Sequence, residues 1–184
     1  MKINNLKMSD VVFIVDDAEK NISSLSTGFG GYSYYHCALY IGNGNIIEAI
    51  PVAGVIQAKL SKYSNKKTLV ARVSESKEFL QELVNNASEF IGFAYNDLFL
   101  PNIKGKLYCS ELIHVAFNSV CEDQYFAQHS LNYIATNDIE VSKYWIDFYG
   151  EYGLKVPQGE SGSHPNNLSL DKKFTHRAFL GSIY

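Results

Sequence analysis

Three residues that lie far apart in the sequence have the side-chain types of a thiol acyl-transfer site: Cys109, His36 and Glu48. Cys109 stands just before an apolar stripe that begins at Leu112, so the pattern predicts that it lies in the first turn of a helix. There, unpaired backbone N–H groups and the helix dipole stabilise a thiolate and lower its pKa. A nucleophile, a base and a group that orients the base form the set that this chemistry requires.

Each of the three also has an ordinary structural explanation. Free cysteines are commonly small buried hydrophobic residues, and this is the favoured explanation for Cys109 when it is considered alone. His36 alone would suit a hydrogen-bonded histidine at the start of a strand, and Glu48 a solvated carboxylate on an open sheet face. Together these explanations weaken, because one site accounts for all three residue types.

Whether His36 and Glu48 can cooperate depends on the turn of the hairpin that joins them. A two-residue loop at 43–44 would place them on opposite faces of the sheet. A three-residue loop at 42–44, with Gly44 in the left-handed conformation, would place them on one face as diagonal neighbours, roughly 7–8 Å apart at Cα. The sequence allows both registers, and only the second gives the polar pair a shared role, so we expect the second. The opposite face would then carry four apolar side chains: Cys37, Leu39, Ile47 and Ala49.

The elements that position these residues follow from the apolar periodicity. Apolar runs bounded by turn residues predict five strands, at residues 10–15, 35–42, 45–50, 54–58 and 67–73. Helical spacing follows in three segments: a first helix after an N-cap at Ser74 that ends near Gly92, a second from Cys109 to Val120, and a third at about 141–152. Glycine- and serine-rich residues 22–34 and residues 93–107 read as loops, and the tail after residue 156 reads as a turn-rich surface segment. Strands followed by helices indicate an α+β domain with an antiparallel sheet.

Composition narrows the class of protein. A length of 184 residues fits one domain, 1–184, with a proper core. A net charge of −3 with scattered lysines and arginines argues against a nucleic-acid partner. No apolar run approaches the roughly 18 residues needed for a transmembrane segment. The odd count of three cysteines makes a reducing cytoplasm the default expectation, and specialised secretion stays open. No zinc-like ligand spacing or phosphate-binding loop is seen, so we expect neither metal nor cofactor.

Several motifs together resemble a known family. They are SDVVFIV at 9–15, YHCALYIGNGNIIEAIP at 35–51, GV at 54–55, LYCSELIHVAF at 107–117 and SHPNNL at 163–168. In these segments the chain resembles the YiiX/YaeF-like branch of the circularly permuted NlpC-type, papain-fold cysteine hydrolases. The resemblance implies a permuted papain-like fold, in which an antiparallel sheet or half-barrel packs against helices and the nucleophile opens a helix. Residues 121–160 carry no motif of this kind.

The resemblance also implies roles for individual residues. Cys109 would be the nucleophile, His36 the base and Glu48 the orienting residue, and Tyr108 would line the site. Tyr35 belongs to a set of aromatic residues in candidate rim segments and is the second candidate substrate-binding residue. Core packing is the favoured explanation for most of that set: Phe29, Tyr32, Tyr34, Tyr35, Phe93, Tyr95 and Phe99.

Two positions depart from the family pattern. Ser9 stands where glycine usually precedes the aspartate, which affects a turn. Cys37 stands where a small aliphatic residue is more usual, and we expect it to face the other side of the sheet from His36.

The remaining histidines are weaker candidates. His114 lies about 140° around the helix from Cys109 and is expected to point elsewhere. His129 and His176 have polar neighbours that indicate surface positions. His164 precedes Pro165 in a loop, and nothing in the sequence requires it to be near the site.

These observations predict a cysteine hydrolase of the amidase or peptidase type, which cleaves an amide or ester through a Cys109 thioester. The substrate would be a peptide, an acyl-amino acid or a lipid. The same spacing also resembles the lecithin:retinol acyltransferase branch, where the third residue is more often histidine; Glu48 favours the hydrolase. A lipid- or protein-directed acyltransferase and a catalytically silent binding module remain the alternatives.

Overall fold

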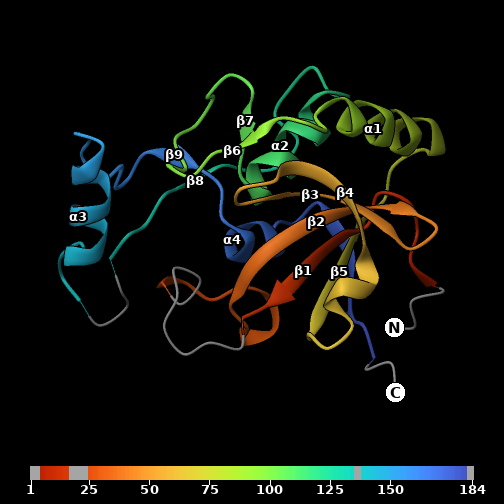
Figure 1. Cartoon of the computed structure of the whole chain (residues 1–184). Coiled ribbons are helices and arrows are strands. Elements are labelled where there is room, and N and C mark those ends of the chain that lie inside the picture. Colours follow the sequence, from red (N-terminus) through yellow and green to blue (C-terminus); the bar gives the residue numbers. More distant parts are fainter. Residues whose placement is uncertain (1–4, 17–24, 135–137, 182–184) are drawn as a thin grey trace.

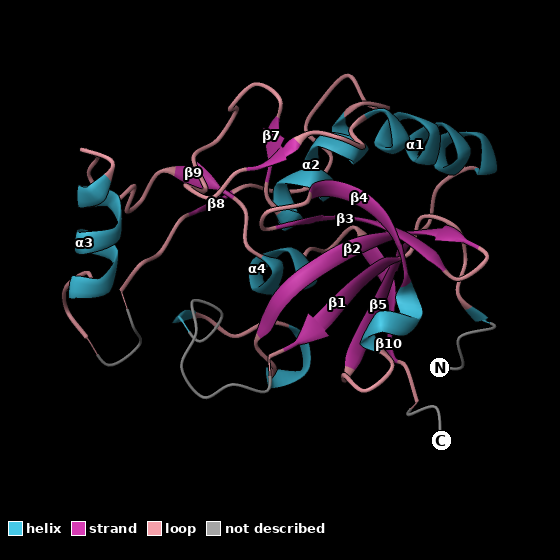
Figure 2. Ribbon diagram, in the orientation of Figure 1, coloured by secondary structure: helices cyan, strands magenta, loops and turns pink. Residues whose placement is uncertain are grey.

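A computed structural model describes residues 5–16, 25–134 and 138–181. Its centre is a six-stranded antiparallel sheet with the order β10-β5-β1-β2-β3-β4 (Figure 2). The strands are β1 (Val11–Val15), β2 (Tyr34–Gly42), β3 (Asn45–Ile50), β4 (Gly54–Lys59), β5 (Thr68–Val73) and β10 (Phe174–Phe179). The predicted α+β class with an antiparallel sheet is therefore confirmed.

One face of the sheet carries the main core, beneath helices α1 (Lys77–Glu89) and α2 (Cys109–Asn118) (Figure 1). Alternate strand residues such as Phe13, Leu39 and Leu69 point into this core, as the period of two in a strand requires. The opposite face carries a smaller cluster: Val12, Ala38, Tyr40, Ile46, Leu60 and Val70. Both faces of the central strands are thus buried, which explains their nearly continuous apolar sequences.

The start of α1 differs from the prediction. Ser76, and not Ser74, is the N-cap residue, and its hydroxyl accepts a hydrogen bond from the Phe79 backbone N–H at 3.1 Å. Both serines satisfy the sequence preference for an N-cap, so sequence alone does not separate them.

The Ser9–Asp10 turn that precedes β1 is held by side-chain contacts. Ser9 has a φ of 74°, a conformation that costs a non-glycine residue energy, and its hydroxyl donates to the Leu80 carbonyl at 3.1 Å. Asp10 accepts two hydrogen bonds from the Arg72 guanidinium, at 2.6 and 2.7 Å. The substitution of serine for the usual glycine is thus confined to a turn, as expected.

The segments after β5 contain elements that the sequence did not indicate. The predicted loop at 93–107 forms a parallel pair of two-residue strands, β6 (Ala94–Tyr95) and β7 (Lys106–Leu107). A second short pair joins β8 (His129–Ser130) to β9 (Ser161–Gly162), and the third helix is α3 (Lys143–Glu151). None of the helices in the described residues is both long and apolar enough to cross a membrane.

The tail is more than the predicted surface segment. It forms the short helix α4 (Pro165–Ser169) and then β10, which pairs with β5 at the edge of the sheet. The Asn166 Oδ1 atom accepts a hydrogen bond from the Tyr34 backbone N–H at 2.6 Å, which attaches α4 to the start of β2. The tail therefore lies against the strand that carries His36 (Figure 1).

Candidate active site

Cys109 is the first residue of α2, as predicted. Tyr108 is the N-cap residue, and its backbone N–H donates to the Glu111 carboxylate at 3.3 Å. Side chains from Leu112 onwards bury α2 against β2 and β3, so the helix presents its N-terminus to the sheet. The Cys109 side chain is buried at this junction, where the amide groups of the first helical turn favour a thiolate.

His36 and Glu48 share a face of the sheet, as predicted. The His36 Nε2 atom and the Glu48 Oε2 atom are 2.8 Å apart, and both side chains are buried. The adjacent residues Cys37 and Ala49 pack in the main core, on the opposite face. These placements confirm the register in which the imidazole and the carboxylate can cooperate.

The predicted three-residue loop is wrong, although the register it gave is correct. The hairpin has a two-residue turn, Asn43-Gly44, with φ values of 52° and 72°, the positive values of a type I′ turn. Strand β2 contains one extra residue, because the ladder pairs Tyr40 with Ile46 and then Gly42 with Asn45. This β-bulge shifts the alternation by one residue and so restores the parity that a three-residue loop would give.

The sulfur of Cys109 lies beside the edge of β2 and not over one face of the sheet. Its pKa is shifted by both His36 and Cys37, consecutive residues whose side chains point to opposite faces. In the described part of the hairpin, the β2–β3 ladder extends from the turn only to the pair Leu39–Ile47. The helix therefore covers the Cys37 face, while its first residue reaches the histidine at the strand edge.

The contacts of Cys109 and His36 shift the pKa values of both side chains. The Cys37 thiol makes the largest contribution to lowering the pKa of Cys109; burial opposes this effect, and the hydrogen bond and charge of His36 lower the pKa further. Burial alone would lower the pKa of His36, but hydrogen bonds to Cys109 and Glu48 raise it to about 9. These contacts favour a thiolate on Cys109 and a proton on His36.

The Glu48 carboxylate is fixed by partners that the sequence did not reveal. Besides His36, it accepts hydrogen bonds from the Lys62 ammonium and the Tyr63 hydroxyl, each at 2.6 Å. Burial would raise the pKa of Glu48, but the hydrogen bonds from His36, Lys62 and Tyr63 lower it to about 2. Lys62 and Tyr63 follow β4 in a 3-10 turn, Leu60–Tyr63, where no local pattern signals contact with β3.

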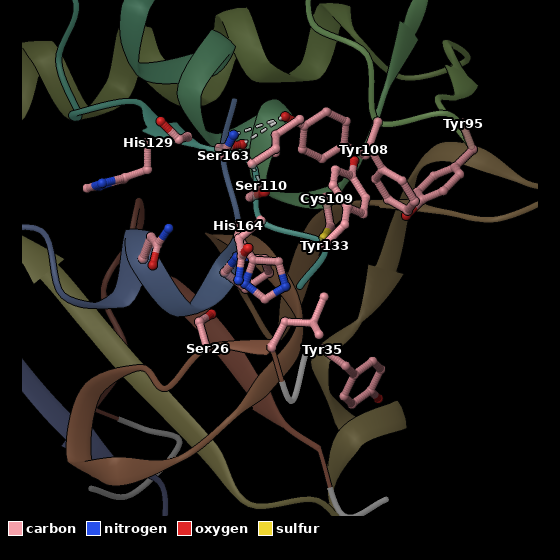
Figure 3. Close-up of a pocket in the computed structure, with 17 residues that line it drawn as sticks. Ser26, Tyr35, Tyr95, Tyr108, Cys109, Ser110, His129, Tyr133, Ser163 and His164 are labelled. Carbon is pink, nitrogen blue, oxygen red and sulfur yellow. Dashed lines mark hydrogen bonds between the residues drawn. The ribbon is translucent and has the colours of Figure 1, made fainter. Parts of the chain in front are cut away.

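A cleft opens above Cys109 (Figure 3). Tyr35 and Tyr108, the two predicted substrate-binding residues, both line it. The full lining is Leu25, Ser26, Tyr35, Tyr95, Phe99, Tyr108, Cys109, Ser110, His129, Ser130, Leu131, Asn132, Tyr133, Ser163, His164, Pro165 and Asn167. These described residues include no lysine, arginine, aspartate or glutamate, so besides the Cys109 thiol the walls carry aromatic, aliphatic, hydroxyl, amide and imidazole groups.

The other histidines differ in their surroundings. His129 and His176 are exposed, as expected, and His129 also lines the cleft. His114 lies four residues after Ser110 on α2, is buried, and packs against the Phe126 ring rather than at the cleft. His164, for which the sequence gave no requirement, lines the cleft together with Cys109. The only sequence signal for this placement was the motif SHPNNL.

Comparison with solved structures shows a similar fold in a bacterial protein. The crystal structure of the metalloprotein YiiX from Escherichia coli O157:H7 superposes with a TM-score of 0.73 at 19% sequence identity, over 97% of this chain and 98% of that chain. Among the described residues of the present chain, no group of three or more His, Cys, Asp and Glu side chains is placed to hold a metal ion. No curated protein matches the chain.

Comparison with protein families gives a match over most of the sequence. The model of the permuted papain-like amidase enzymes, the YaeF/YiiX or C92 peptidase family, matches residues 5–176. This range includes the β2–β3 hairpin, the start of α2 and the segment before α4. The chain belongs to the permuted papain-like amidase family.

Proposed function

We propose that the protein is a cysteine amidase that cleaves an uncharged amide through a thioester at Cys109, with His36 as acid and base and Glu48 as the orienting carboxylate. The observation that carries this proposal is the position of His36, which contacts the Cys109 thiol and the Glu48 carboxylate at once. Since Nε2 is directed to Glu48, Nδ1 is the ring nitrogen available to the sulfur.

The reaction follows from the charges of the pair. The Cys109 thiolate attacks the carbonyl carbon, a C–S bond forms, and the carbonyl electron pair moves to oxygen. The His36 imidazolium gives its proton to the leaving nitrogen as the C–N bond breaks, which leaves a thioester and a neutral imidazole. His36 then removes a proton from water, the hydroxide attacks the thioester, and the Cys109 thiolate departs from the carboxylic acid product.

The cleft favours a particular class of substrate. A charged acyl group would lose its hydration against walls that offer no ion-pair partner among the lining residues, whereas an aromatic or aliphatic group would be covered by Tyr95, Phe99 and Tyr133. We therefore expect uncharged acyl groups to be preferred over carboxylated or ammonium-bearing ones.

A panel of fluorogenic amides tests the proposal. The acyl group on 7-amino-4-methylcoumarin would be acetyl, hexanoyl, phenylacetyl, succinyl or glycyl, and coumarin release would be measured for the native protein and for Cys109→Ser. We expect release from the neutral members, little from succinyl and glycyl, and none with Cys109→Ser. Equal release by Cys109→Ser, or no release from the whole panel, would contradict the proposal.

The same assay separates hydrolysis from acyl transfer. An added amine acceptor such as hydroxylamine intercepts the thioester, and the products can be identified by mass. A hydrolase gives mainly the carboxylic acid at low acceptor concentration. Exclusive acylation of the acceptor, with no turnover in its absence, would instead assign the protein as an acyltransferase.

A further inference from the structure

Two histidines that line the cleft, His129 and His164, have no part in the mechanism described above, and His129 is exposed. His164 is the N-cap residue of α4, and its Nδ1 atom accepts a hydrogen bond from the Asn166 backbone N–H at 3.1 Å. It lines the cleft together with Cys109, and Figure 3 shows its ring near the Cys109 side chain. A ring that is fixed at one nitrogen and borders the reacting sulfur has a defined orientation.

The contact at Nδ1 determines which ring nitrogen carries the proton. A neutral imidazole has one N–H donor and one acceptor nitrogen, so the acceptor role of Nδ1 places the hydrogen of His164 on Nε2. Burial lowers the pKa of His164 to about 4, and the negative charge of Cys109 opposes this only in part. At neutral pH the residue is therefore an uncharged ring with a single donor.

The segment that carries His164 is anchored on both sides. Asn166 accepts a hydrogen bond from the Tyr34 backbone N–H at 2.6 Å, and its Nδ2 atom donates to the Ser26 carbonyl at 2.7 Å. Pro165, the first residue of the helix, further restricts the backbone. A donor held in this way needs no reorganisation when charge develops in the cleft.

The neighbouring hydroxyls are engaged with one another. The Tyr108 hydroxyl accepts hydrogen bonds from the backbone N–H and the hydroxyl of Ser163, each at 3.2 Å. The Ser163 and Ser110 hydroxyl oxygens are 2.9 Å apart. These hydroxyls therefore contact one another. No partner is assigned to the Nε2–H of His164 within the described residues.

We propose that His164 is a catalytic residue whose Nε2–H donates a hydrogen bond to the substrate carbonyl oxygen, and to the oxyanion that replaces it, beside the backbone N–H of Cys109. The inference rests on the proposed function and adds an oxyanion donor to it. As the Cys109 sulfur bonds to the carbonyl carbon, the electron pair of the C=O bond moves to oxygen, and both donors stabilise the negative charge. No proton leaves His164 in this step, and His36 remains the source of the proton for the leaving group.

The test compares two reactions of the same sulfur. p-Nitrophenyl acetate acylates a thiolate through an oxyanion and releases nitrophenolate, whereas iodoacetamide alkylates it at a saturated carbon and forms no oxyanion. For His164→Ala we expect the single-turnover acylation rate to fall about 10²-fold or more, with the alkylation rate of Cys109 unchanged. Unchanged acylation, or an equal fall in both rates, would overturn the proposal.

Two variants serve as controls. His164→Asn preserves an N-cap residue and supplies an amide N–H, so it should recover part of the acylation rate that His164→Ala loses. His176→Ala removes an exposed histidine of β10 and should leave both rates unchanged. Circular dichroism of each variant shows whether the fold is retained.

A spectroscopic measurement is independent of turnover. In the native protein with ¹⁵N-labelled histidine, the ring nitrogen shifts of His164 should show a neutral tautomer that is protonated at Nε2. A tautomer protonated at Nδ1, or a charged ring at pH 7, would overturn the proposal. Failure of the proposed function gives a different pattern, because Cys109 of the native protein would then alkylate no faster than the other cysteines.

Discussion

Two histidines with nearly equal burial have pKa values that are shifted in opposite directions. His36 and His114 are 6% and 4% exposed, respectively. His36 contacts Glu48 and Cys109, and these contacts raise its pKa to about 9 against the effect of burial. In the described structure neither ring nitrogen of His114 has a hydrogen-bond partner, and burial lowers its pKa to about 4.

The difference shows that partners, and not depth, decide what a buried imidazole can do. Removal from water disfavours the charged ring in both places. At His36 the contacts with Cys109 and Glu48 reverse that effect and favour the charged ring. At His114 the ring is neutral and packs against Phe126. Its two ring nitrogens are buried without hydrogen-bond partners in the described structure, which costs stability.

The largest effect is expected from removal of the partnered ring. His36→Ala should lower kcat/KM for a neutral coumarin amide by about 10⁴-fold, the upper part of the range for general acid–base groups. Circular dichroism would confirm that the variant folds. A fall of less than about 10-fold would show that His36 is not the acid and base.

The unpartnered ring should affect stability and not catalysis. The folded-state pKa of His114, about 4, lies below the unfolded value of about 6.5, so its contribution is present above pH 6.5 and is lost as the pH falls towards 4. His114→Leu should remove up to about 3 kcal/mol of the stability loss between pH 7 and pH 4. Urea unfolding at several pH values measures this difference.

The control for this prediction is His176→Leu, which replaces an exposed histidine. The stability of that variant should depend on pH in the same way as the stability of the native protein. An acid slope in His114→Leu equal to the native slope would show that His114 is protonated, and therefore partnered, in the folded protein. Activity at pH 7 should be unchanged in His114→Leu.

The next variant changes Glu48, the partner of His36, and leaves the His36 ring in place. Glu48→Gln keeps the shape but removes the charge that stabilises the imidazolium, so the pKa of His36 should fall and kcat/KM should drop about 10²-fold. Lys62→Gln, which leaves the His36–Glu48 contact intact, should cost less. The reverse order of the two variants would show that Lys62, and not Glu48, organises the site.

The smallest effect is expected from Cys37, because a thiol is a weak hydrogen-bond donor and His36 still lowers the pKa of Cys109 in the variant. Its thiol lowers the pKa of Cys109, so Cys37→Ala should raise that pKa and slow alkylation at pH 6 by less than about tenfold. Cys37→Ser retains a hydrogen-bond donor and should resemble the native protein. Alkylation that is equally fast in both variants and in the native protein would exclude a role for this contact.

The sequence predicted the site better where the contacts are local. Cys109 at the helix start follows from the apolar stripe, and the shared face of His36 and Glu48 follows from strand alternation. The turn itself was wrong, because a two-residue turn with a bulge and a three-residue loop give the same parity. Sequence spacing therefore allowed the shared face, the need for a common role favoured it, and neither gave the turn.

Contacts between distant segments were not predictable from local patterns. Lys62 and Tyr63 reach Glu48 only because β4 folds back on β3, and His164 reaches the cleft only because α4 binds the start of β2. Strand β10 was missed because its pairing with β5 depends on the fold of the whole chain. Contacts between such distant segments can be assigned only when the order of the strands in the sheet is known.

The central claim is that the surroundings of Cys109, chiefly Cys37 and His36, favour its thiolate at neutral pH. Iodoacetamide alkylation of the three cysteines, followed by peptide mass spectrometry from pH 5 to pH 10, tests it most directly. Cys109 should reach its full alkylation rate well below pH 8.5, while Cys37 and Cys121, whose pKa values are raised mainly by burial, should react slowly. Equal rates for all three cysteines, with a common midpoint near pH 8.5, would contradict an activated Cys109.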